Sequence, residues 1–200
     1  MTTWVEPEGG RERGLEGLAK SFTQVLLSPV SFFDEAVSPG DQAPGLVFGM
    51  AVVLVAAATR LTLTPTEPLA FPAAGWLRVV LTAALVVMLV TPAAIHALSA
   101  LQTLALVVVA PSRAGVSETV QVIAYAAAPC VVAGLGVPVV TALAGLWAFA
   151  LLVVGTRVVH DISWLRALLA AFAPGVLAFG GGFGAWPAIQ TVAAGAGLAL

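Results

Sequence analysis

Hydrophobic residues near the start of the chain recur with the period of an α-helix. From residue 14 to about residue 29, apolar side chains fall on one face and polar side chains on the other. Charge interrupts the pattern too often for a membrane span, so it predicts an amphipathic helix on a membrane surface. The apolar positions are Leu15, Leu18, Phe22, Val25, Leu26 and Pro29, and the polar ones are Glu16, Lys20 and Gln24.

A second short helix is predicted directly after the first. Ser28 is suited to the N-cap position, and the proline that follows it is suited to the first helical position. The segment SPGDQAP, residues 38–44, ends the helix. Between these limits lie Phe32 and Phe33, which we expect to contact a cytoplasmic partner or lipid.

Long apolar runs dominate the chain from residue 45 onward. About 20 apolar residues, at about 1.5 Å each, cross a bilayer core about 30 Å thick. The second run, with about 34 residues, would form a helix about 50 Å long. We therefore expect one helix that kinks at Pro92 and projects beyond the membrane, and a division into two segments is the alternative. The predicted spans cover residues 45–61, 77–110, 117–136, 137–159 and 163–183.

These runs predict an all-α fold: a polytopic transmembrane helical bundle of about five spans with proline kinks, preceded by an N-terminal amphipathic interfacial helix. Residues 62–75 contain three prolines and are expected to form an extended loop. The apolar C-terminal tail is too short to span and is expected at the membrane interface. We divide the chain into a cytoplasmic tail with amphipathic helices, a five-span domain and the short C-terminal tail, at residues 1–42, 43–186 and 187–200.

Composition agrees with this assignment. Hydrophobic residues make up 60% of the chain and charged residues 9%, with a mean hydropathy of +1.04. Soluble domains carry about 25% charged residues, so a soluble protein of this composition would expose apolar surface over most of its area. We expect the lipid bilayer to surround the chain, and we expect no nucleic-acid partner.

The distribution of lysine and arginine predicts the orientation. With five spans and the N-terminus in the cytoplasm, six basic residues lie inside and two outside, as the positive-inside rule requires. We therefore expect an integral protein of a prokaryotic plasma membrane, with its C-terminus outside. The inner residues are Arg11, Arg13, Lys20, Arg113, Arg157 and Arg166, and the outer ones are Arg60 and Arg78.

The third predicted span, which begins SETVQVIAYAAAP at residues 117–129, combines polar and helix-breaking residues. Ser117 can cap the first turn, and Glu118 suits the positive end of the helix dipole. The hydroxyl of Tyr125, about two turns further on, needs a partner. Pro129 removes one backbone hydrogen bond and predicts a bend.

Three stretches resemble one known family. PSRAGVSETVQVIAYAAAP, residues 111–129, carries the pattern S-E-T-x-x-x-x-A-Y-A-x-x-P after a long second span. LLSPVSFFDEA, residues 26–36, resembles the lead-in helix of prokaryotic members, and TRVVHDISWLRALLAAF, residues 156–172, resembles the junction of the fourth and fifth spans. The chain is thereby similar to the Yip family (Ypt-interacting protein domain) of five-span membrane proteins, over residues 21 to about 185.

The resemblance implies the fold and the topology. Eukaryotic members carry acidic cytoplasmic motifs that are linked to Rab GTPases and vesicle traffic. Those motifs have no clear counterpart here, so that role is not carried over to this chain. For prokaryotic members the resemblance implies no particular activity.

Charged residues gather at the predicted cytoplasmic ends of the spans. They indicate a contact site for a lipid headgroup or a partner protein, or they serve only for orientation and helix capping. Two of them, Arg157 and Asp161, could pair if their helix continues that far. The predicted contact set is Arg113, Glu118, Arg157, His160, Asp161 and Arg166.

Polar residues also recur inside the second span. Ionisable groups in a membrane helix usually face the bundle interior or water, so the stripe indicates a proton or solute path with His96 as its titrating group. The alternative is hydrogen bonding between helices. The predicted stripe is His96, Ser99, Gln102 and Thr103, with Tyr125 from the third span.

Two functions follow from these observations. The first is a non-enzymatic membrane scaffold that recruits a membrane or cytoplasmic protein, with self-association as a further option. The second is a small transporter or channel built on the His96 stripe. No catalytic, metal or cofactor motif occurs in the chain, so we expect neither enzyme activity nor a cofactor.

Overall fold

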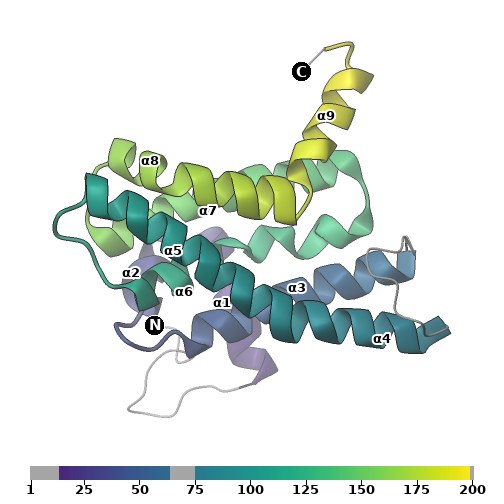
Figure 1. Ribbon diagram of the computed structural model, residues 1–200, viewed down its shortest axis with the longest axis horizontal. Helices are drawn as coiled ribbons and strands as arrows, with labels where there is room; N and C mark the ends of the chain where they lie inside the picture. Colours follow the sequence, from purple (N-terminus) through teal and green to yellow (C-terminus); the bar gives the residue numbers. More distant parts are fainter. Residues whose placement is uncertain (1–13, 64–74, 199–200) are drawn as a thin grey trace.

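The protein is described by a computed structural model that covers residues 14–63 and 75–198, and within these residues every regular element is a helix (Figure 1). The predicted all-α class is therefore confirmed. Among the described residues, four helices are long and apolar enough to cross a membrane, and a bent helix pair makes a fifth if the two helices form one span. This agrees with the prediction of about five spans.

The two N-terminal helices are α1 (Leu15–Leu27) and α2 (Pro29–Ala36). The predicted apolar face is present in part: Val25 is buried, and Leu18, Phe22 and Leu26 pack against the core. Leu15, which was predicted on the same face, is 85% exposed. Ser28 separates the two helices at the N-cap position of α2, but its side chain makes no capping hydrogen bond.

The spans that follow are long. Helix α3 (Ala43–Leu63) is the first. The second is continuous from Gly75 to Val109 and consists of α4 (Gly75–Leu85), the π-helical segment η1 (Val86–Val90) and α5 (Thr91–Val109). At 35 residues it is about 52 Å long, so it exceeds a bilayer core of about 30 Å. The predicted single overlong helix is confirmed.

The irregularity in this second span precedes its proline. Pro92 occupies the second position of α5, and because it has no N–H group it cannot bond to the preceding turn. The π-helical turn of η1 lies directly before it, and the Thr91 hydroxyl donates to the Val86 carbonyl at 2.8 Å. Side-chain bonds of this kind let membrane helices carry proline.

The third span is broken. Helix α6 (Val116–Ala126) is followed by the 3-10 helix η2 (Ala128–Leu135), and the two meet at an angle of 41°. The bend predicted from Pro129 is therefore present, with that proline in the first turn of η2. Every residue of α6 from Glu118 to Ala126 is buried. Helix α6 is the central element of the bundle and contacts α1, α3, α5 and α7.

The last spans are α7 (Pro138–His160) and α8 (Trp164–Gly175), which continues as the π-helical segment η3 (Val176–Gly182). Gly184, with φ of 75°, turns the chain into α9 (Ala185–Gly195). Helix α9 crosses α7 and then projects away from the bundle (Figure 1). The described part of the C-terminal tail thus consists mainly of a helix that is too short to span, and its place at the membrane interface stays a prediction.

One core cluster joins the N-terminal helices to the spans. Phe32 and Phe33 are exposed by only 3% and 1%, and the Phe32 ring lies edge-on to Tyr125 with 4.9 Å between centroids. The prediction that these two phenylalanines contact a partner or lipid is therefore wrong. Their helix lies directly on α7, so its apolar side meets protein and not the interface.

Candidate functional site

Polar side chains are buried together where α5, α6 and α7 meet, at the end of the bundle covered by α2. We call this end the α2 end. The residues are at most 9% exposed, which is unusual inside a membrane protein unless the polar groups bond to one another. The polar cluster consists of Gln102, Glu118, Thr119, Thr156 and His160.

One hydrogen-bond chain links α5 to α7. The side-chain amide of Gln102 donates to the Thr156 hydroxyl oxygen at 2.6 Å, and that hydroxyl donates to the Leu152 carbonyl at 2.6 Å. The amide oxygen of Gln102 has no hydrogen-bond partner among the described residues. The alternative function of the polar stripe, hydrogen bonding between helices, is thus present for Gln102.

A second contact links α6 to α7. The Thr119 hydroxyl donates to the Gly115 carbonyl at 3.1 Å and lies 3.4 Å from Nε2 of His160. Since a hydroxyl has one proton, this arrangement requires Nε2 of His160 to donate. Nδ1 of His160 is then an acceptor, and within the described residues it has no partner.

The first turn of α6 differs from the prediction. Gly115 is the N-cap, so Ser117 lies inside the helix and does not cap it. Glu118, three residues after the N-cap, interacts with the Gly115 backbone and accepts a hydrogen bond from the Ser117 hydroxyl. A glutamate at this position can accept a hydrogen bond from a backbone N–H group at the start of the helix, which would otherwise have no partner. Its negative charge also suits the positive end of the helix dipole, as predicted.

The arginine and aspartate at the end of α7 do not form the predicted i, i+4 pair. The helix ends at His160, and Asp161 turns into the left-handed region with φ of 46°. The helical spacing that would bring the two side chains together is therefore lost. The Arg157 guanidinium instead lies 4.7 Å from the ring centroid of Trp164 on α8, a cation–π contact.

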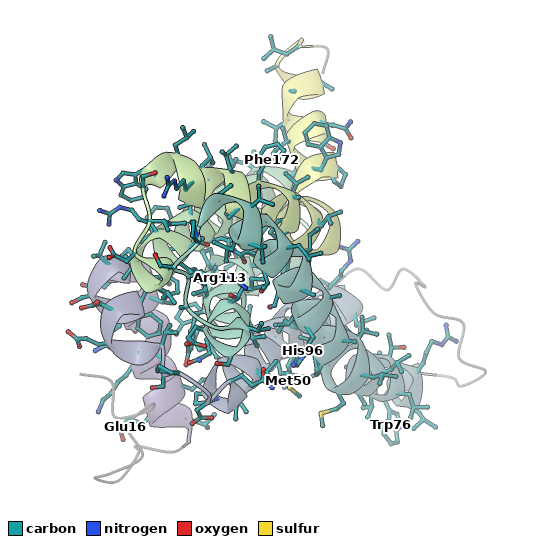
Figure 2. The ribbon with its side chains drawn as sticks, turned by 60° about the vertical axis from the view of Figure 1, so that its left-hand side comes forward. Glu16, Met50, Trp76, His96, Arg113 and Phe172 are labelled. Carbon is teal, nitrogen blue, oxygen red and sulfur yellow. The ribbon has the colours of Figure 1, made fainter. Side chains whose placement is uncertain are left out.

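The predicted contact set therefore divides into two groups. Glu118 and His160 are buried in the polar cluster, whereas the other members lie at its rim, where Arg157 is half-buried. Figure 2 shows Arg113 at this end of the bundle. The exposed rim residues are Arg113, Asp161 and Arg166.

The predicted polar stripe also divides. Ser99 and Gln102 are fully buried, but His96 is exposed on the outer side of the long helix (Figure 2), and its Nδ1 lies 2.7 Å from the Pro92 carbonyl oxygen. Six residues of an α-helix rotate the face by about 120° from the starting position. For this reason His96 and Gln102 do not share a face, and Thr103 is half-buried between them. Tyr125 lies elsewhere in the core, among Phe32 and Phe48.

Hydrogen bonds that the sequence pattern does not predict join Gln121 of α6 to Ser38 in the α2–α3 connection, and we call this contact the Gln121 latch. The Gln121 side chain donates to the Ser38 carbonyl at 2.7 Å and accepts from the Ser38 N–H group at 3.2 Å. The Gly40 N–H group donates to Ser117 at 2.9 Å. The signal in the sequence is Gln121 itself, a glutamine in an otherwise apolar helix. A buried side-chain amide needs hydrogen-bond partners, so its presence indicates a polar contact with another segment.

Metal-ligating side chains do not cluster here. In the described ranges, no three His, Cys, Asp or Glu side chains come close enough to hold a metal ion.

Long apolar helices around a buried central helix define the class: a polytopic α-helical integral membrane protein. The chain belongs to the Yip1 domain family, since the model of the Yip1 domain matches residues 23–185. The resemblance read from the sequence is thereby confirmed. No curated protein and no solved structure shows a significant match to the chain.

Proposed function

We propose that this Yip1-domain protein is a non-enzymatic membrane scaffold that holds a partner protein at the cytoplasmic surface of a prokaryotic plasma membrane. The observation that carries the proposal is the way α2 packs on the bundle. The apolar side of α2 is buried, with Phe33 against Gly155 of α7 and Phe32 against Tyr125. The opposite side of α2 is therefore held in a fixed position and faces outward.

That outward side combines two kinds of side chain. Val30 of α2 is 53% exposed, Leu27 at the end of α1 is 77% exposed, and the carboxylates Asp34 and Glu35 of α2 are exposed as well. Carboxylates require an aqueous surface, while exposed aliphatic residues next to charge are typical of a protein contact. We call Val30, Asp34 and Glu35, together with Leu27 at the end of α1, the α2 outer face, and these residues favour a partner with basic residues around an apolar centre.

The orientation in this proposal rests on charge. Lys20, Arg113, Arg157 and Arg166 belong to α1 and to the α2 end of the spans, and Arg60 and Arg78 belong to the opposite end. The positive-inside rule then supports a cytoplasmic α2 end. An odd number of crossings would leave the C-terminus outside.

Site-specific photo-crosslinking in native membranes tests the scaffold. A benzophenone amino acid at Val30 of the full chain should give a discrete cross-linked protein. The same probe at Leu104, which is exposed on α5 at 66%, is the control for a lipid-facing position. Asp34→Lys should abolish the Val30 product, whereas Asp161→Lys, an equal charge change at the same end, should not. A Val30 product that is absent, or that survives Asp34→Lys, contradicts the proposal.

The alternative function, transport along the His96 stripe, requires polar groups on one face. His96 and Gln102 lie on different faces, so the contacts favour the scaffold. Proton or solute flux in sealed liposomes, compared between the wild-type protein and His96→Ala, decides between the two functions. Flux that is lost in the variant would establish transport and overturn pure scaffolding.

A further inference from the structure

A groove opens at the end of the bundle opposite to α2, which we call the Arg60 end. Its volume is about 480 Å³, within the range of about 300–1,000 Å³ typical of ligand pockets. It is bounded by α3, by the first half of the second span, by η2 and by the corner between η3 and α9. Its lining includes Arg60, Thr82, Val86, Gly134, Gly181 and Pro187.

The groove results from the divergence of two spans. Helices α5 and α8 pack along each other at the α2 end, where Leu106, Ala110 and Ala170 form a small cluster. Towards the Arg60 end the two spans separate (Figure 1), and within the described residues neither α4 nor η1 packs closely on η3. Helix α3 and η2 form the floor of the space between them.

Small side chains keep the groove open. Ala56, Ala57 and Ala133 line its floor, and Gly181 lies on the η3 wall. A Cβ atom added at Gly181 would meet no other atom within 4 Å, so this wall faces open space. Both π-helical segments, η1 and η3, contribute to the walls through Val86 and Gly181, and π-turns occur frequently at functional sites.

The surroundings indicate what occupies the groove. It lies between membrane spans and is lined mainly by alanine, valine and glycine, and a mainly apolar lining at this place suits an acyl chain better than water. Arg60 lies about 26 Å along α3 from Ala43, close to the depth at which a bilayer core of about 30 Å ends and phosphates begin. A guanidinium at this level is complementary to a lipid phosphate.

We propose that the groove is a binding site for an anionic phospholipid of the bilayer, with an acyl chain between the separated spans and the phosphate on Arg60. This site is independent of the α2 outer face and of the scaffold function. It lies at the other end of the bundle and uses none of the same residues.

Native mass spectrometry of the full chain in detergent, titrated with phosphatidylglycerol or phosphatidylcholine, tests the site. We expect the wild-type protein to retain phosphatidylglycerol in preference to phosphatidylcholine. Gly181→Leu should fill the groove and abolish specific retention of both lipids. Ala97→Leu, which adds the same side chain at an exposed position of α5, should leave retention unchanged. Ala57→Leu fills the groove from the α3 side. It replaces Gly181→Leu in the test if the Gly181→Leu protein does not fold.

The charge is tested separately. Arg60→Gln should lower the affinity for phosphatidylglycerol about tenfold, the effect of losing one charged hydrogen bond, and should remove the preference between the lipids. Arg78→Gln makes the same charge change on α4 and should have little effect. The site is overturned if both groove-filling variants retain lipid like the wild-type protein. It is also overturned if Arg78→Gln matches Arg60→Gln, because that result means general attraction to surface charge.

Discussion

The α2 end and the Arg60 end of the bundle hold their helices in different ways. At the α2 end, ring contacts around Tyr125, the Gln121 latch and the Gln102–Thr156 bond join α2, α5, α6 and α7. At the Arg60 end, two spans separate and small residues face a groove. At the α2 end, directional hydrogen bonds and close packing allow only one arrangement of the helices. At the Arg60 end, small residues have no helix packed against them and leave a space, which we propose is filled by lipid.

The largest effect in this comparison is expected from Phe33→Ala. This ring is 1% exposed and fills the space above Gly155, and loss of a buried phenylalanine costs about 3–5 kcal/mol. Reversible unfolding in mixed micelles should show this loss of unfolding free energy. Leu104→Ala, at an exposed position, is the control and should change stability little. A small effect of Phe33→Ala would mean that α2 is not part of the core.

Glycine replacements compare the two ends directly. A Cβ atom at Gly155 would come within 2.8 Å of the Phe33 ring, while one at Gly181 would meet no atom within 4 Å. We expect Gly155→Ala to destabilise the protein by about 1–3 kcal/mol through overpacking. Gly181→Ala should be neutral or slightly stabilising. The same unfolding measurement checks both, and equal effects would refute the contrast between a close-packed end and an open end.

Breaking the latch should have a smaller and more local effect. Gln121→Leu removes the side-chain partners of both backbone groups of Ser38, a loss of about 1 kcal/mol. Hydrogen exchange of the Ser38 amide should accelerate while the amides of α7 keep their protection. Gln190→Leu, an exposed glutamine on α9, is the matched control. Unchanged exchange at Ser38 would show that the latch does not hold the α2–α3 connection.

The smallest effect is expected in the polar cluster. Gln102→Leu removes the bond to Thr156, but that hydroxyl keeps its bond to the Leu152 carbonyl. Hydrogen bonds between membrane helices average about 0.6 kcal/mol in double-mutant cycles. A cycle of Gln102→Leu with Thr156→Val should measure a coupling of this size. A coupling free energy several times larger would contradict this ranking, because the polar cluster would then contribute substantially to the stability of the α2 end.

Several features were predictable because they depend on local chemistry. Long apolar runs must form helices in lipid, since the backbone has no other way to satisfy its polar groups. The amphipathic pattern of α1 and the bend before Pro129 follow from helical periodicity and from the missing proline N–H group. Glu118 at the first turn of α6 was predictable from the helix dipole, although Ser117 as its cap was not correct.

The contacts of the candidate site could not be predicted in the same way. Inward and outward faces of a membrane helix are both apolar, so hydropathy does not distinguish them. For this reason the polar pattern predicts His96 on the interior face with Gln102, although it is exposed. The amphipathic pattern before the spans likewise does not show whether its apolar side meets lipid or protein, and Phe32 and Phe33 are buried on protein.

The sequence by itself determined the class of protein, the approximate number of spans and the membership of residues in helices. Only the tertiary structure decided which faces meet. It placed α6 at the centre, joined Gln121 to Ser38 across 83 residues and separated two spans at the Arg60 end. The physical reason is that lipid imposes secondary structure residue by residue, whereas partners are selected by the shapes of side chains that lie far apart in the chain.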